Sequence, residues 1–148
     1  MADDTLALLR QVENVAALAA LRGRIDEQGK VYVMDFDTGG YRSQRVLVRV
    51  TGQGPNGKPM LTIYSPARLV PRRWWRWLSR KEAIEILRLN ESMRFARYGL
   101  ADTPEGMLVV VSADMVLETL DADELRIHAY AVAHAADRYE AQYGSDQF

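Results

Sequence analysis

Hydrophobic positions in the first part of the chain recur at the spacing of a helix. Four apolar residues lie three or four positions apart and therefore share one face. These residues are Leu8, Val12, Val15 and Ala19. The polar segment Asp3-Asp4-Thr5 before them offers N-cap side chains, and glycine after them can adopt the left-handed conformation that ends many helices. The pattern predicts a helix that ends near Gln28 and Gly29.

The next part of the chain alternates between apolar and polar residues, which is the period of a strand. In Arg45–Val50 the valines point to one face and the arginines to the other, as in an antiparallel strand with one buried face. Two neighbouring segments, Val31–Phe36 and Met60–Tyr64, are rich in strand-forming residues. Because glycine-containing turns separate the three segments, we expect an antiparallel meander rather than parallel strands joined by helices.

Ser79 and Glu82 form the signature of a capping box, in which the serine caps an amide and the glutamate reaches back to the cap. The signature predicts a helix from this point to about Asn90. Two further strands are predicted at Arg94–Leu100 and Met107–Val111. The second is apolar throughout, which indicates a strand covered on both faces of the sheet.

A long final helix is predicted after Asp121, where the cap signature recurs with Glu124. Its apolar positions fall on one stripe. The stripe consists of Leu125, Ala129, Val132, Ala136, Tyr139 and Tyr143. The complete order is α-β-β-β-α-β-β-α, which predicts a single α+β domain over residues 1–148, with an antiparallel sheet flanked by helices.

The composition narrows the class of protein. The 148 residues are 48% hydrophobic and 26% charged, as is typical of one globular domain. The chain has no cysteine, which excludes disulfides, thiol catalysis and thiolate metal sites. Its apolar runs are shorter than a membrane span, and the N-terminal MADDTLALL lacks the basic region of a signal peptide. We therefore expect a cytosolic protein that makes no contact with a membrane and needs no metal or other cofactor.

The net charge of −1 conceals an uneven distribution. Residues 42–97 contain 13 basic and three acidic side chains, whereas residues 98–148 contain two basic and ten acidic ones. A basic segment attracts phosphates, or it pairs with the acidic part of the chain within one molecule or across a dimer. We expect such pairing, because a dedicated nucleic-acid binder is rarely acidic overall.

Three motifs suggest chemistry, and each has a simpler interpretation. Gly52–Lys58 matches a phosphate-binding loop, but that loop must open a helix and here a strand follows. Asp37-Thr38-Gly39 matches the aspartic-protease triplet, yet the glycines around it favour a β-turn. His128 and His134 lie six positions apart on the predicted last helix, so they do not share a face as a metal-binding pair does. We predict no catalytic residues and no enzyme activity.

The stretch PRRWWRWL, Pro71–Leu78, contains all three tryptophans of the chain and three arginines. It lies in a predicted connector over Ser65–Ser79, and connectors of this length are often functional. Three interpretations are open: the rings pack on the sheet, the segment binds a partner protein or a second copy, or the rings stack on single-stranded bases while the arginines neutralise phosphates. The candidate partner-binding or dimer residues are Arg72, Arg73, Trp74, Trp75, Arg76 and Trp77.

The stretch LRLNESMRFARYGLADTPEGMLVVVSADM, followed by LDADEL and by AADRY in the last helix, resembles the type III secretion chaperone fold and its YbjN-like relatives. The likeness covers Leu87–Tyr143 in its apolar positions and turns, and the part before it matches only in element order. The resemblance implies a cytosolic homodimer without enzyme activity, a chaperone-like or regulatory adaptor that binds another protein. The alternative is an accessory factor associated with nucleic acid or with a DNA-processing protein through the residues 72–77.

Overall fold

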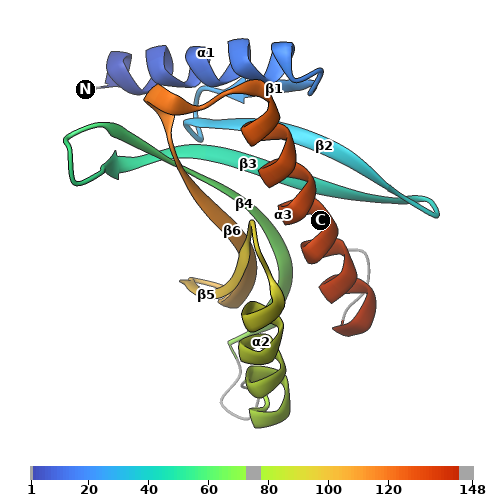
Figure 1. Ribbon diagram of the computed structural model, residues 1–148. Coiled ribbons are helices and arrows are strands. Elements are labelled where there is room, and N and C mark those ends of the chain that lie inside the picture. The colour runs from blue at the N-terminus through green and yellow to red at the C-terminus, as the bar shows by residue number, and fades with distance from the viewer. Residues whose placement is uncertain (1, 73–77, 144–148) are drawn as a thin grey trace.

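The computed structural model describes residues 2–72 and 78–143. In these ranges the elements are α1 (Ala2–Leu18), β1 (Gly23–Asp26), β2 (Val31–Gly39), β3 (Arg42–Gln53), β4 (Pro59–Pro71), α2 (Arg80–Ser92), β5 (Arg97–Thr103), β6 (Gly106–Val116), the short 3₁₀ helix η1 (Leu117–Thr119) and α3 (Ala122–Tyr143). The strands form one antiparallel sheet in the order β1-β2-β3-β4-β6-β5 (Figure 1). The predicted α+β class and the predicted succession of helices and strands are confirmed, with β1 as an additional strand.

Helix α1 ends at Leu18, well before the predicted boundary. Ala20 takes a left-handed φ of 57°, and the N–H of Leu21 donates to the carbonyl of Ala16 at 2.8 Å. This geometry belongs to a Schellman motif, here with alanine at the position where glycine is usual. The side chain of Leu21 is buried against the core. The packing of Leu21 therefore stabilises this helix end, although the sequence has alanine and not glycine at the left-handed position.

The residues predicted to complete that helix form a hairpin instead. Asp26 Oδ1 accepts hydrogen bonds from the amides of Gln28 and Gly29, each at 3.1 Å, and this turn joins β1 to β2. Gly29 thus shapes a turn and not a helix end. The helix also begins at Ala2, so the predicted cap Asp3-Asp4-Thr5 lies inside its first turn.

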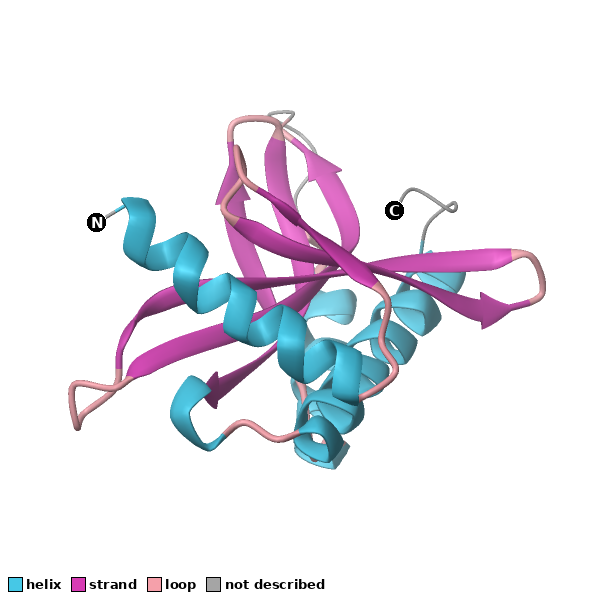
Figure 2. Ribbon diagram, turned by 90° about the horizontal axis from the view of Figure 1, so that it is seen from above, coloured by secondary structure: helices cyan, strands magenta, loops and turns pink. Residues whose placement is uncertain are grey.

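Helices α1 and α3 lie together on one side of a strongly twisted sheet (Figure 2). On β3, Val46 and Val48 are completely buried while Arg45 and Arg49 are exposed, which confirms the predicted alternation. The predicted stripe of α3 is also confirmed from Leu125 to Tyr139, all of whose members are buried. No helix in the described ranges is both long and apolar enough to cross a membrane.

The opposite face of the sheet carries no described helix. The buried apolar residues of all three helices belong to one cluster on the first face. On β6, Val109 is fully buried in that cluster, whereas Leu108 and Val110 point the other way and are half-buried. β6 is an interior strand, but the prediction that it is covered on both faces is wrong for the described residues. We call this second surface the outer face; it includes the half-buried residues Leu47, Tyr64, Pro66, Leu108, Val110 and Ser112.

Strand β4 is longer than its hydrophobic pattern suggests. The prediction ended this strand at Tyr64 and assigned Ser65–Ser79 to a connector, but β4 continues to Pro71. Pro66 has no N–H to donate, and it lies where β4 no longer pairs with β3. An extra residue, Ala67, forms a bulge that keeps β4 paired with β6 beyond this proline. The connector between β4 and α2 is therefore only residues 72–79.

Candidate functional site

Arg72 is the one member of the predicted arginine–tryptophan set that the structure describes. It is exposed, and its backbone N–H donates to the carbonyl of Glu105 at 2.9 Å. This hydrogen bond ties the start of the connector to the turn between β5 and β6. The other candidates lie outside the described residues, so their role stays a prediction; they are Arg73, Trp74, Trp75, Arg76 and Trp77.

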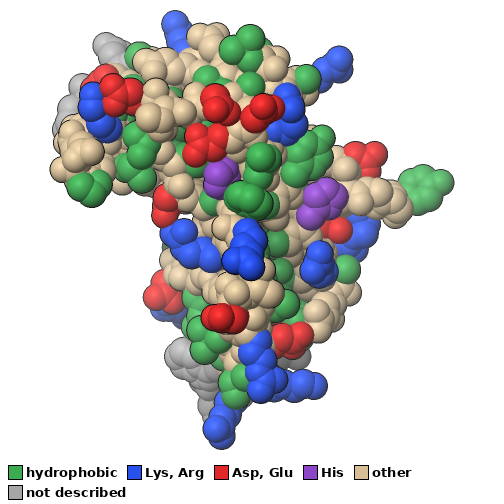
Figure 3. All heavy atoms as spheres, in the orientation of Figure 1, with side chains coloured by type: hydrophobic (Ala, Val, Ile, Leu, Met, Phe, Trp, Pro, Cys, Tyr) green, Lys and Arg blue, Asp and Glu red, His purple; other side chains and the backbone are tan. Residues whose placement is uncertain are grey.

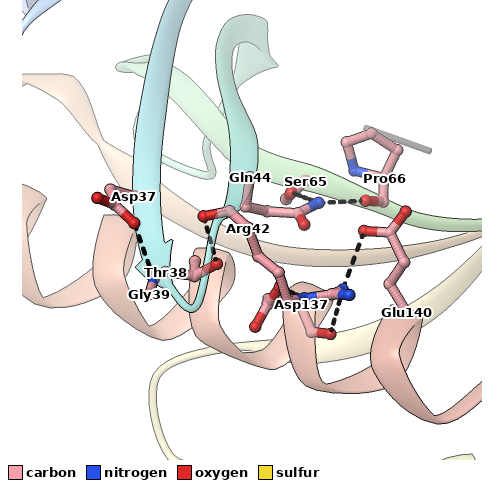
Figure 4. Close-up of polar contacts among 9 residues, drawn as sticks. All are labelled: Asp37, Thr38, Gly39, Arg42, Gln44, Ser65, Pro66, Asp137 and Glu140. Atoms are coloured by element: carbon pink, nitrogen blue, oxygen red, sulfur yellow. Dashed lines mark hydrogen bonds and ion pairs between the residues drawn. The ribbon is translucent and has the colours of Figure 1, made fainter. Parts of the chain in front are cut away.

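Polar side chains fill the place where β3 and β4 diverge. The ladder between these strands ends at Leu47 and Tyr64, after which β3 pairs only with β2 and β4 only with β6. Beyond this point Gln44 Nε2 donates to Ser65 Oγ at 2.9 Å and to the carbonyl of Pro66 at 2.7 Å (Figure 4). The side-chain amide thus replaces the missing backbone hydrogen bonds. Its Oε1 has no hydrogen-bond partner among the described residues.

Arg42 joins the same region to helix α3. Its Nε donates to Asp137 Oδ1 at 2.7 Å, and its Nη2 lies 3.9 Å from Glu140 Oε2 (Figure 4). The Glu140 side chain is completely buried, while that of Arg42 is partly exposed. A carboxylate can be buried at tolerable cost only beside a cation or several donors. The contacts of Arg42 with Asp137 and Glu140 therefore hold the C-terminal half of α3 against the β2–β3 hairpin.

Ion pairs link the basic middle of the chain to its acidic C-terminal part, as the charge distribution suggests. Arg42 reaches α3, and two other pairs cross between the same parts of the sequence. They are Lys58–Glu118 at 2.8 Å and Arg97–Asp114 at 2.5 Å. Pairing within one chain thus accounts for a share of the basic segment's charge.

Glu82 is buried between helix α2, strand β4 and helix α3. Ser79 Oγ accepts the Glu82 N–H at 3.1 Å, which confirms the serine half of the predicted capping box. The carboxylate does not reach back to the cap as predicted, because Oε1 instead accepts hydrogen bonds from Arg68 Nη1 and the Tyr139 hydroxyl. Burial, together with the Glu82 carboxylate, raises the pKa of Tyr139 well above its usual range. The phenol therefore stays neutral and acts as a donor.

A second carboxylate–tyrosine pair, Glu85 and Tyr143, joins helices α2 and α3 closer to the solvent. The Tyr143 hydroxyl donates to Glu85 Oε2, which raises the pKa of Tyr143 to about 12 and lowers that of Glu85.

The hydrogen bond that raises the pKa of Tyr143 stabilises the fold fully below pH 10, and this stabilisation is lost as the pH rises from about 10 towards 12. We expect the free energy of unfolding to fall less over this window in Tyr143→Phe than in the natural chain. Urea denaturation at successive pH values measures it, and equal losses in the two proteins would contradict the assignment.

The two motifs that resemble catalytic loops belong to the hairpins β2–β3 and β3–β4. Asp37 Oδ1 accepts the N–H of Gly39 at 2.8 Å, which closes the end of β2. In the Gly52–Lys58 segment the N–H of Gly54 donates to the carbonyl of Lys58 at 2.8 Å, and β4 follows directly. The Gly52–Lys58 segment opens no helix, so its turn interpretation is confirmed, whereas Asp37-Thr38-Gly39 lies in the bulged end of β2 and the turn itself falls at Gly40 and Tyr41.

The two histidines have separate aromatic neighbours. The His128 ring meets Phe95 edge to face with centroids 5.9 Å apart, while His134 stacks on Tyr130 at 6.0 Å. His128 Nδ1 lies 2.8 Å from the carbonyl of Glu124 and acts as the donor in that hydrogen bond. Within residues 2–72 and 78–143, no three histidine or carboxylate side chains are grouped so that they could hold a metal ion.

A ridge formed by Arg94 and Phe95 separates two hollows on the side of the molecule that carries both histidines, shown in purple in Figure 3. The ridge lies between α2 and β5, and Phe95 is 52% exposed. A hollow of about 330 Å³ lies toward His128, and another of about 240 Å³ lies toward His134 and Arg138. We call the surface made by these five residues the Phe95 face.

The Phe95 face is positively charged. Arg94, Arg97 and Arg138 line its hollows, and Asp114 is the acidic residue among the lining side chains. Asp114 is already held by Arg97 at 2.5 Å and by the Thr62 hydroxyl at 2.6 Å. Arg94 and Arg138 form no ion pair with any residue that the structure describes. The guanidinium groups of Arg94 and Arg138 are therefore available to bind an anionic group beside the exposed ring of Phe95.

Helix α2 covers the edge of the sheet beside this face at Tyr98. Asn90 Oδ1 accepts the N–H of Tyr98 at 2.7 Å, and Asn90 Nδ2 donates to the Tyr98 carbonyl at 3.0 Å. This double contact ties the edge strand to α2, the helix that carries Asn90. Strand β5 begins at Arg97 and not at the predicted Arg94. Because outward-facing backbone groups alternate in an antiparallel strand, those of Leu100 point away from β6 as well.

Comparison with known proteins does not assign the chain to a family. Neither a scan against protein-family models nor a search of the curated proteins gives a match.

Sequence reasoning missed the Phe95 face. The pattern placed Arg94 and Phe95 inside a strand, where alternation would separate their side chains, and it rejected the histidines as a metal pair without assigning them to a surface. A signal was nevertheless present, since a bulky aromatic residue between two arginines at a helix–strand junction has no strand partner to bury it. That α3 brings His128 and His134 to the two sides of this ring is decided by helix packing.

Proposed function

We propose that the protein is a non-enzymatic, chaperone-like or regulatory adaptor of the cytosol that binds a partner protein and acts as a homodimer. The observation that carries the proposal is the outer face of the sheet. Soluble chains rarely leave a contiguous apolar surface of a sheet uncovered unless another molecule covers it.

The apolar side chains of the outer face lie next to one another across the strands. Leu47 is paired with Tyr64, and Pro66 is paired with Val110 in the neighbouring ladder. Each of these four residues is half-buried by its neighbours and still reaches solvent. Together they form a continuous apolar centre that runs over β3, β4 and β6.

Charged side chains of both signs surround this centre. Arg45 Nε donates to Asp35 Oδ1 at 3.0 Å on one side, and Arg97 pairs with Asp114 on another. The guanidinium carbon of Arg49 lies 5.4 Å from the centre of the Tyr64 ring. An apolar centre with a mixed polar rim is the ordinary anatomy of a protein interface. Because both signs occur, the same surface on a second copy is electrostatically compatible with it.

The element order agrees with the likeness to type III secretion chaperones and YbjN-like proteins, which bind segments of other proteins as dimers. Under this proposal the outer face joins two copies, and the remaining exposed surfaces are available to the partner protein. The buried carboxylates Glu82 and Glu140 have arginines beside them, so these groups support the fold and do not need a substrate to explain them.

Val110→Glu tests the dimer. A carboxylate in the apolar centre of the outer face is expected to convert a dimer into a folded monomer, because each copy would bury an unpaired charge. Sedimentation velocity measures the mass, and far-UV circular dichroism checks the fold. Leu100→Glu is the matched control: it adds the same charge on the adjacent strand β5 but to the helix-bearing side, where Leu100 is 51% exposed. A natural chain that sediments as a monomer, or a dimer unaffected by Val110→Glu, would contradict the proposed assembly.

A further inference from the structure

We infer that the Phe95 face binds a short acidic segment of the partner protein, with an apolar side chain beside Phe95 and carboxylates on Arg94 and Arg138. The inference rests on the proposed adaptor function and specifies the chemistry of the partner. It uses a surface that adjoins the outer face at the Arg97–Asp114 pair but is built mainly on α3 and on the segment before β5.

The shape of the surface fits side chains better than a cofactor. The two hollows, of about 330 and 240 Å³, lie near or below the lower limit of ordinary small-molecule pockets, which is about 300 Å³. They flank one ridge, so an extended or helical segment crossing the ridge can place successive side chains in both. Phe95 stands between them, and half-exposed aromatic residues are frequent anchors of protein interfaces.

The second element of the surface is the solvent side of α3. Ala131 and Ala135 are small and partly exposed, and they line the smaller hollow with His134 and Arg138. Small residues let another backbone approach closely, while His134 and Arg138 supply polar contacts at the rim. The apolar floor and cationic rim together match a segment that mixes leucine or phenylalanine with aspartate or glutamate.

The arginines explain why the segment should be acidic. Arg94 and Arg138 have no carboxylate partner among the described residues, whereas Arg97 on the same surface is paired with Asp114. A guanidinium group binds a carboxylate with two parallel hydrogen bonds, which gives both orientation and affinity. Lysine-rich or neutral segments would leave these groups without a partner.

A long polyanion fits this surface less well than a short acidic segment. Asp121, Asp123 and Glu124 lie where α3 begins, on the helix that carries the histidines. Figure 3 shows acidic side chains in red above the upper histidine. A nucleic-acid strand running across the Phe95 face would meet these carboxylates, whereas a peptide confined to the two hollows would not.

The test uses the full chain and a fluorescein-labelled peptide in which glutamate alternates with leucine and phenylalanine. Fluorescence anisotropy is expected to show saturable binding that the double variant Arg94→Glu, Arg138→Glu weakens by about tenfold or more. Phe95→Ala is expected to weaken it several-fold without a change in the circular dichroism spectrum. The matched control, Arg10→Glu with Arg22→Glu, changes the net charge equally at exposed positions on and after α1, and the affinity should stay within about twofold.

Further arms separate the alternatives. A peptide with lysine in place of glutamate should not bind, and oligothymidine should not compete with the acidic peptide. The inference is overturned if the acidic peptide does not bind, if the double variant binds as tightly as the natural chain, or if oligothymidine binds this face more tightly. A dimer that Val110→Glu dissociates but that ignores the acidic peptide would refute this inference and leave the proposed function standing.

Discussion

Gly106→Ala is expected to destabilise the fold by about 3 kcal/mol or more. Gly106 begins β6 at a φ of 155°, and a Cβ built there would lie 2.1 Å from the carbonyl oxygen of Val70. It would also come within 2.9 Å of the backbone nitrogen of Arg72. Both are backbone atoms, one within β4 and one directly after it, so no side-chain rotation can relieve the overlap. The strands β4 and β6 would have to separate at this end.

Gly57→Ala provides the control for Gly106→Ala. Gly57 also has a positive φ, of 70°, but nothing lies within 4 Å of its added Cβ. Only backbone strain is expected there, at about 1 to 2 kcal/mol. Urea denaturation followed by circular dichroism measures both variants. Equal destabilisation would show that the close approach at Gly106 is unimportant. The Gly106 substitution is also expected to disturb the start of the connector, because the Arg72 N–H donates to the carbonyl of Glu105, the residue before Gly106.

Arg68→Met is expected to lower the free energy of unfolding by about 3 kcal/mol. Arg68 is the cation that neutralises Glu82, whose side chain is 7% exposed, and its guanidinium carbon lies 5.8 Å from the centre of the Tyr143 ring. Methionine fills similar space but leaves the carboxylate buried, with the Tyr139 hydroxyl as its remaining donor among the described side chains. The penalty comes from an uncompensated buried charge rather than from lost packing.

Removing the whole polar cluster distinguishes these two causes. The triple variant Arg68→Met, Glu82→Leu, Tyr139→Phe leaves no charge to compensate, so most of the lost stability is expected to return. Lys58→Met is the surface control, because Lys58 and Glu118 form an exposed ion pair whose loss is expected to cost less than about 1 kcal/mol. Urea denaturation again provides the free energies. If the triple variant is no more stable than Arg68→Met alone, the loss in Arg68→Met does not come from an uncompensated buried charge.

Local patterns predicted those parts of the fold whose stabilisation is local. The α3 stripe repeats at the helical period, so its buried face could be assigned before any neighbour was known. In β3 the alternation of valine and arginine likewise determines which side chains are buried, whatever strand lies beside it. The class and the order of elements follow from these two periods.

The errors occur where a distant contact overrides the local pattern. Helix α1 stops at Leu18 because Leu21 packs into the core, although Ala20 gives no local stop signal. Strand β4 continues past Pro66 because β6 pairs with it there. The Glu82 carboxylate does not complete the capping box because it accepts hydrogen bonds from Arg68 and Tyr139 in the interior. None of these partners lies close enough in sequence to be visible in a periodicity.

The amino-acid sequence by itself determined the α+β class, the buried faces of the long elements and the turns, because these depend on the period of neighbouring residues. Only the tertiary structure decided that the outer face has no described helix over it, and that the ring of Phe95 stands between His128 and His134. Surfaces of this kind are assembled from residues far apart in the chain. Their composition therefore depends on how helices pack on the sheet, which no single segment of sequence specifies.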